Sequence, residues 1–257
     1  MNYVNYEVAD RIGTITLNRP DKRNALSGEM VVELKSALER AATDDNVKVV
    51  VLAAAGDAFC AGADLAYLQQ LQNNTYEENL TDSASLMALF KMIYQLEKVV
   101  IAKVQGHAIA GGCGLATVCD FSFTVPEAKF GYTEVRIGFI PAIVKVFLLR
   151  KLGEGKSKEL LLSGDLIDAE KAEAMGLINW VVASEELDEK VNAFAAKLVA
   201  KNSGQSMALT KRMIAEVQNL SLDDGLQHAA EQNATARATE DCQKGIAAFL
   251  NKEKISW

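Results

Sequence analysis

Two segments of small residues can bring backbone groups close to a ligand. The first covers residues 58–65 (AFCAGADL), and the second covers residues 106–115 (GHAIAGGCGL). Each follows an apolar run, at residues 47–53 and 99–104, that predicts a strand buried on both faces. Loops at the carboxyl ends of such strands are where open α/β sheets bind ligands, and small side chains let a ligand approach the backbone.

The second segment also predicts the start of a helix after Gly111. The first N–H groups of a helix have no partner within it, so they can donate to an anion or to an oxygen that gains charge during a reaction. Neither segment matches the GxGxxG pattern, and neither contains the lysine of a phosphate-binding loop. The pair favours a backbone oxyanion hole over a phosphate cradle. Two structural turns are the alternative interpretation.

Glu134 is an acidic residue beside an apolar segment. It lies between Tyr132 and a largely apolar stretch at residues 135–140. Partial burial would raise its pKa, and such a carboxylate can transfer a proton at carbon or activate a water. The alternative is a solvated surface glutamate. His107 also has two interpretations, which are packing or hydrogen bonding within the fold and contact with a ligand.

Composition excludes several classes of function. The net charge of −7 disfavours nonspecific binding to nucleic acid. Four cysteines show no CxxC pairing and two histidines form no ligand cluster, which predicts no metal site and reduced core thiols of a cytoplasmic protein. The N-terminal residues contain no basic region and no long apolar run. We therefore expect no signal peptide and no contact with a membrane.

The elements that must position these residues alternate along the first two-thirds of the chain. Residues 3–8 and 14–17 predict a hairpin, and Ser27 predicts the cap of a helix that continues to about residue 42. A third apolar run at residues 120–125 follows the two already named, which indicates an α/β fold with parallel strands. The later residues predict helices at 187–199, 206–217, 222–238 and 241–252. We expect an α/β core over residues 1–202 and a helical region over residues 203–257.

Five ordered motifs resemble the crotonase (enoyl-CoA hydratase/isomerase) superfamily over nearly the whole chain. They are residues 18–26 (NRPDKRNAL), 58–65, 106–120, 130–135 with 138–141, and 163–164 through 176–178. Residues 133–135, 140–142 and 114–115 are most similar to the bacterial methylglutaconyl-CoA hydratase-like branch. The resemblance implies a spiral of ββα units with a C-terminal α-helical trimerisation region. It also implies a homotrimer or homohexamer whose substrate is an acyl-CoA.

The resemblance assigns roles to individual residues. Ala63 and Gly111 would donate backbone N–H groups to the thioester oxygen, and Glu134 would be the acid/base. The coenzyme A groove would be lined by Lys22, Arg23, Ala25, Ala61, Asp64 and Leu65. Phe249 and Lys252 match residues that the family brings to the nucleotide end from a neighbouring subunit. His107, Gly114 and Tyr132 are candidates for contact with the acyl group. Coenzyme A is part of the substrate, and no further cofactor is expected.

The sequence departs from the best-known hydratases at Gly114, where they carry a second glutamate. We expect hydration of a 2-enoyl-CoA, with 3-methylglutaconyl-CoA or another branched acyl-CoA as substrate. An isomerase that uses Glu134 alone is the alternative. Gly114 would make room for a bulky or carboxylated acyl group. An idle Glu134 would leave a noncatalytic acyl-CoA binder. An RNA-binding relative would need a basic helix, but residues 27–42 mix two basic residues with three glutamates.

Overall fold

A six-stranded sheet forms the centre of the molecule. The computed structural model describes residues 2–257, apart from the side chain of Leu65. The sheet contains, in spatial order, β1 (Val4–Ala9), β2 (Ile12–Leu17), β3 (Val49–Ala54), β5 (Val99–Val104), β7 (Phe121–Thr124) and β10 (Trp180–Val181). β1 and β2 form the predicted antiparallel hairpin, and each later neighbour is parallel. β3 and β5 are almost entirely buried, as their continuous apolar sequences predicted.

A second sheet is made of very short strands. It contains β4 (Ala58–Cys60), β6 (His107–Ile109), β8 (Lys129–Gly131) and β9 (Ile167–Asp168). β4, β6 and β8 are parallel, and β9 is antiparallel to β8. The sequence analysis identified no strand at these positions. Three-residue strands are too short to show an alternating pattern, so only their pairing identifies them.

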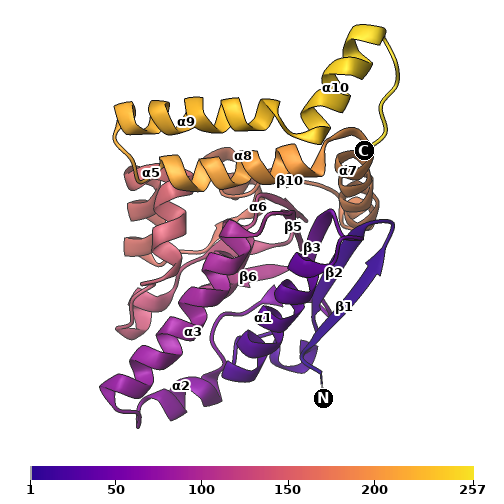
Figure 1. Cartoon of the computed structure of the whole chain (residues 1–257). Helices are drawn as coiled ribbons and strands as arrows, with labels where there is room; N and C mark the ends of the chain where they lie inside the picture. Colours follow the sequence, from indigo (N-terminus) through magenta and orange to yellow (C-terminus); the bar gives the residue numbers. More distant parts are fainter. Residues whose placement is uncertain (1) are drawn as a thin grey trace.

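The chain passes repeatedly from the first sheet to the second and then into a helix (Figure 1). β3 and β4 lead into α2 (Leu65–Leu71) and α3 (Tyr76–Gln95). β5 and β6 lead into α4 (Gly111–Val118), and β7 and β8 lead into the 3-10 helix η2 (Glu134–Ile137) and α5 (Val144–Ser163). This repetition confirms the expected spiral of ββα units.

The remaining helices cover the sheets. They are the 3-10 helices η1 (Pro20–Lys22) and η3 (Ser184–Glu186) with α1 (Gly28–Thr43), α6 (Ala169–Met175), α7 (Leu187–Lys201), α8 (Gly204–Val217), α9 (Leu222–Arg237) and α10 (Glu240–Asn251). Ser27 caps α1 as predicted, because its Oγ accepts from the N–H of Met30 at 3.4 Å. α7 packs on β2, β3, β5 and β7, while α8 and α9 lie side by side. The four predicted C-terminal helices correspond to α7 to α10.

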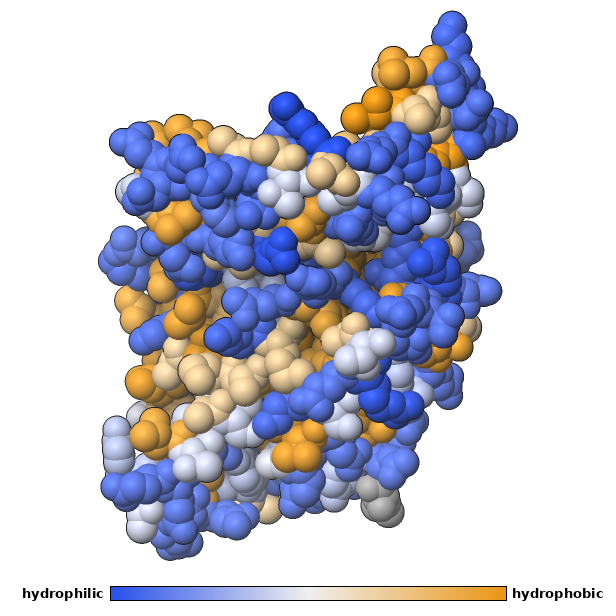
Figure 2. Space-filling model, viewed as in Figure 1, coloured by the Kyte–Doolittle hydropathy of each residue, from blue (hydrophilic) through white to orange (hydrophobic). Residues whose placement is uncertain are grey.

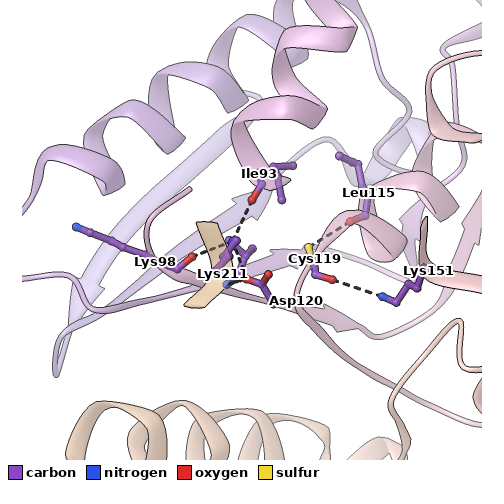
Figure 3. Close-up of polar contacts among 8 residues, drawn as sticks. Ile93, Lys98, Leu115, Cys119, Asp120, Lys151 and Lys211 are labelled. Carbon is purple, nitrogen blue, oxygen red and sulfur yellow. Dashed lines mark hydrogen bonds and ion pairs between the residues drawn. The ribbon is translucent and has the colours of Figure 1, made fainter. Parts of the chain in front are cut away.

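Half-buried lysines tie separate elements together (Figure 3). The ammonium group of Lys211 in α8 donates to the carbonyls of Ile93 at 3.1 Å and Lys98 at 3.0 Å, and to Asp120 Oδ2 at 2.7 Å. Lys151 donates to the carbonyl of Cys119 at 3.4 Å. The division after residue 202 that we predicted lies between α7 and α8. The contacts of Lys211 join the two predicted parts, so the division into a core and a helical region stays a prediction.

Candidate active site

Three parallel strands of the second sheet deliver the predicted catalytic groups to one edge. Ala63 follows β4, Gly111 follows β6, and Glu134 follows β8. The strands are neighbours, with Cys60 paired to Ala108 and Ile109 paired to Gly131. The carboxyl ends of adjacent parallel strands lie at the same edge, so the three groups share one region of the fold.

The loop that carries Ala63 is held by backbone pairing with the segment that carries Leu26. Leu26 donates to the carbonyl of Gly62 at 2.7 Å, and Asp64 donates to the carbonyl of Leu26 at 2.9 Å. These two bonds form a parallel bridge between Leu26 and Ala63. In such a bridge the N–H of the middle residue points away from the partner strand. The Ala63 N–H accordingly has no acceptor within residues 2–257.

Asn24 fixes the other side of this loop, a role that our sequence analysis missed. Its side chain is wholly buried, and its Nδ2 donates to the carbonyls of Ala55 and Ala58, both at 2.8 Å. Its Oδ1 accepts from the N–H of Arg19 at 2.9 Å. Asn24 has a left-handed backbone with φ of 52°, and Arg23 before it has φ of 49°. Asparagine tolerates this conformation better than most residues, which is the signal that the sequence offered.

The side chain of Asp64 is engaged in two structural contacts. Its Oδ1 caps α2 by accepting from the N–H groups of Ala66 at 2.8 Å and Tyr67 at 3.2 Å. Its Oδ2 pairs with Arg19 at 2.8 Å. Arg19 was also missed by the sequence analysis. The backbone of Asp64 is engaged as well, because its carbonyl accepts from the N–H of Leu68 at 2.9 Å, so the residue holds the loop and the start of α2 in place.

Gly111 begins α4, and its N–H has no acceptor in the described part of the chain. The preceding Ala110 donates to the carbonyl of Gly131 at 2.7 Å and accepts from Gly114 at 3.0 Å. α4 is buried from Gly112 to Val118. A Cβ on Gly112 would lie 2.2 Å from the carbonyl oxygen of Cys60, so glycine is required for α4 to approach β4. The dipole of α4 adds positive potential at Gly111.

Glu134 is half-buried, and its Oε2 atom is buried without a hydrogen-bond partner among the described residues. Burial raises the pKa of this carboxyl above its usual value. A buried polar atom without a partner is uncommon in a folded protein. A raised pKa and an open acceptor are both properties of a general acid/base.

Two acyl-contact predictions need correction. Tyr132 has no exposed surface, and its hydroxyl is hydrogen bonded to that of Thr117 at 3.0 Å. A Cβ on Gly114 would lie 2.4 Å from Val144 Cγ1 and 3.0 Å from Phe90 Cε1. Gly114 therefore serves close packing of α4 against α5 and α3, and the room that we expected for an acyl group is filled.

His107 does not join the catalytic groups. Its ring is exposed at the first residue of β6, at the end of that strand opposite to Gly111. Its Nδ1 accepts from the N–H of Lys129 at 3.1 Å. The interpretation as a hydrogen-bonding residue of the fold agrees with this position.

The predicted groove residues lie around the loop that carries Ala63. Lys22 and Arg23 are exposed, Ala25 is buried and Ala61 is half-buried. Ala61 donates to the carbonyl of Arg23 at 3.0 Å, which joins the two segments. The side chain of Leu65 lies outside the described residues.

The two residues predicted to reach a neighbouring subunit lie on α10 and at its C-terminal cap. This helix projects from the body of the molecule at the top of Figure 1, whereas β6 lies near the centre of the molecule. Apolar residues colour its surface in Figure 2, and Ile246, Phe249 and Leu250 are exposed on it. Phe249 exposes 82% of its surface, and Lys252 ends the helix in a left-handed conformation. Neither residue is brought to the site of its own chain.

The cysteines, the potential metal ligands and the apolarity of the helices bear on other kinds of site. Burial raises the pKa of Cys60 to about 12 and that of Cys113 to about 11, so neither thiol is an activated nucleophile. No group of three or more metal-ligating side chains occurs in residues 2–257. None of the helices in this range is long and apolar enough to cross a bilayer.

Comparison with known proteins identifies the family. The family model described as enoyl-CoA hydratase/isomerase matches residues 7–257. A Thermus thermophilus protein assigned as an enoyl-CoA hydratase is 44% identical, over 94% of this chain and 95% of its own. The crotonyl-CoA hydratase of Syntrophomonas wolfei is 35% identical, over 98% of this chain and 96% of its own. The crystal structure of an enoyl-CoA hydratase from Mycobacterium smegmatis superposes with a TM-score of 0.93 at 32% identity, over 99% of this chain and 98% of that one. The chain belongs to the enoyl-CoA hydratase/isomerase family, within the crotonase superfamily, and is an enzyme.

Proposed function

We propose that this enzyme is a lyase that adds water across the double bond of a 2-enoyl-CoA thioester. The observation that carries the proposal is the arrangement at one edge of the second sheet. Ala63 and Gly111 bring N–H groups without acceptors in the described chain, and Glu134 brings a half-buried carboxylate. Addition of water to the double bond of a 2-enoyl thioester requires donors that stabilise the thioester oxygen and a carboxylate that transfers a proton.

In the proposed reaction the two N–H groups donate to the thioester oxygen. Glu134 accepts a proton from water as the water oxygen bonds to C3 of the substrate. The charge that develops on the thioester oxygen is stabilised by the two donors. Glu134 then delivers the proton that it accepted from water to C2, which regenerates its carboxylate. The product is a 3-hydroxyacyl-CoA. The raised pKa of Glu134 makes its ionised form a stronger base than a solvated glutamate.

We place the coenzyme A part of the substrate along residues 22–26 and 61–64. Lys22 and Arg23 are exposed cations in a loop bonded to Ala61, and coenzyme A is polyanionic. The proposed reaction uses no cofactor besides the coenzyme A that the substrate carries. Phe249 and Lys252 are proposed to reach this groove in a neighbouring subunit. A homotrimer or homohexamer would supply them, and a light-scattering mass of one 27.8 kDa chain would refute that assembly.

An isomerase is the second candidate, and the packing at Gly114 favours it. Val144 and Phe90 occupy the space into which a side chain at this position would extend. Gly114 itself offers no second carboxylate to hold a water, and one carboxylate is sufficient to move a proton between C2 and C4 of a 3-enoyl-CoA. Cytoplasmic location is a proposal that rests on the cysteine pattern, and a branched acyl group such as 3-methylglutaconyl is one that rests on the resemblance.

A substrate panel separates the two reactions. Purified enzyme would be incubated with crotonyl-, 3-methylcrotonyl-, 3-methylglutaconyl- and 3-enoyl-CoA, with a Glu134→Gln variant as the matched control. A product heavier by one water, formed by the parent protein and not by the variant, supports the lyase. Conversion of 3-enoyl-CoA to 2-enoyl-CoA at constant mass supports the isomerase. Binding without any turnover would leave a noncatalytic acyl-CoA binder.

A further inference from the structure

Ala110 has a backbone conformation that alanine rarely adopts. Its φ is 50° and its ψ is −121°, in a region that is largely restricted to glycine. Arg23 and Lys252 also have positive φ, but their ψ values of 37° and 34° place them in the ordinary left-handed region. Ala110 is therefore held by its surroundings in a conformation that its own side chain disfavours.

Both backbone groups of Ala110 are fixed. Its N–H donates to the carbonyl of Gly131 in β8 at 2.7 Å. Its carbonyl accepts from Gly114 in the first turn of α4 at 3.0 Å. The two hydrogen bonds hold Ala110 between β8, which precedes Glu134, and α4, which begins with Gly111.

The methyl group of Ala110 packs against the other oxyanion loop. A Cβ built on Gly62 would lie only 2.9 Å from the Cβ of Ala110, and it would lie 3.8 Å from the nitrogen of Gly111. The methyl group fills the notch that Gly62 leaves. Gly62 itself has φ of 92°, so each loop has an unusual conformation at the point of contact.

The two residues in contact are the ones that directly precede the two donors. The ψ angle of a residue sets the direction of the next N–H, so Gly62 orients the N–H of Ala63 and Ala110 orients the N–H of Gly111. A contact between Gly62 and Ala110 therefore couples the two donor peptides. Preorganised donors are effective only if both lie near 3 Å from the developing oxyanion.

We propose that Ala110 is a positioning residue whose methyl group, wedged against Gly62, fixes the spacing and direction of the two oxyanion donors. This inference rests on the proposed function, because it assumes that Ala63 and Gly111 bind the thioester oxygen. The strain at Ala110 is retained because the same conformation aims the N–H of Gly111.

The test compares Ala110→Gly with Ala110→Ser, and uses Asp10→Gly as the matched control. Glycine removes the wedge and also the strain, so Ala110→Gly should melt at or above the parent temperature while its kcat falls about 10-fold. Its KM should change by less than about 3-fold, since the coenzyme A groove is untouched. Serine keeps the Cβ and should retain most of the turnover. Asp10 also has positive φ, in the exposed turn between β1 and β2, and its change should leave kcat unaltered.

A spectroscopic measurement distinguishes positioning from general packing. The carbonyl stretch of bound, ¹³C-labelled butyryl-CoA reports the strength of the two hydrogen bonds, and it should lie closer to its value in free solution in Ala110→Gly than in the parent. An unchanged stretch and unchanged kcat in Ala110→Gly would overturn the role of Ala110. So would an equal loss of turnover in the folded serine variant. If the parent protein itself neither shifts the stretch nor turns over an enoyl-CoA, the proposed function fails instead.

Discussion

Replacing Lys211 with methionine should destabilise the enzyme, because the carboxylate of Asp120 loses its partner. The ammonium group lies 2.7 Å from Asp120 Oδ2, and the two side chains expose 10% and 24% of their surfaces (Figure 3). Removing one partner of a buried pair typically costs ~3–5 kcal/mol. Partial exposure of Asp120 lowers this, so we expect a loss of about 2–4 kcal/mol in the free energy of unfolding at pH 7.

The loss has an upper limit, because Asp120 can bind a proton instead of remaining charged. Protonating an ordinary aspartate at pH 7 costs about 4 kcal/mol, from ~1.36 kcal/mol for each of about three pH units. Burial already raises the pKa of Asp120, against the opposing effect of Lys211. In Lys211→Met this opposing effect is lost, and the folded pKa rises further above the unfolded value. Stability then falls as pH rises between these two pKa values, so the variant should lose less stability at pH 5 than at pH 7.

Urea unfolding at both pH values would measure the effect. The matched control is Arg212→Met on the same helix, since Arg212 pairs with Glu97 at 3.1 Å but both side chains are well exposed. That change should cost no more than about 1 kcal/mol. The double variant Lys211→Met/Asp120→Asn should recover much of the loss, because it leaves no unpaired carboxylate at position 120. Equal losses in Lys211→Met and Arg212→Met, or no recovery in the double variant, would refute the reasoning.

Three further predictions concern the site. Glu134→Gln should lower kcat by ~10²–10⁴-fold with little change in coenzyme A ester affinity, and the kcat/KM of the parent should fall as pH falls through the raised pKa of Glu134, where the base becomes protonated. Steady-state kinetics and calorimetric titration check both, and near-parent turnover of the variant would remove Glu134 from the mechanism. Gly114→Ala should lower the free energy of unfolding by about 1–3 kcal/mol, because the added methyl group overpacks against Val144. Adding Val144→Ala should restore part of that stability. Thermal melts in which the two substitutions lower stability additively would contradict this packing. Asn24→Ala should lower the free energy of unfolding by about 2–4 kcal/mol, because it removes three hydrogen bonds that hold the loop before Ala63. It should lower kcat as well. A variant with unchanged melting temperature and kinetics would show that other contacts hold this loop.

Local sequence determined the long elements and the identity of the candidate donors. The continuous apolar runs of β3 and β5 predicted buried parallel strands, and Ser27 predicted the start of α1. These signals lie within a few residues of one another, where periodicity and capping chemistry operate. The motifs around Ala63 and Gly111 and the acidic residue Glu134 were likewise visible as sequence. The carboxyl-end rule for parallel strands applied to the loops of Ala63 and Gly111, but it did not place Glu134.

Tertiary contacts decided what surrounds those residues. β4 and β6 are three residues long and exist through pairing with each other and with β8. The space at Gly114 is filled by Val144, which lies 30 positions later in the chain. Lys211 finds Asp120 across 91 positions, and the methyl group of Ala110 meets Gly62 from another loop. Steric fit and charge pairing depend on distance in space, so no local pattern could specify which side chain would occupy each position.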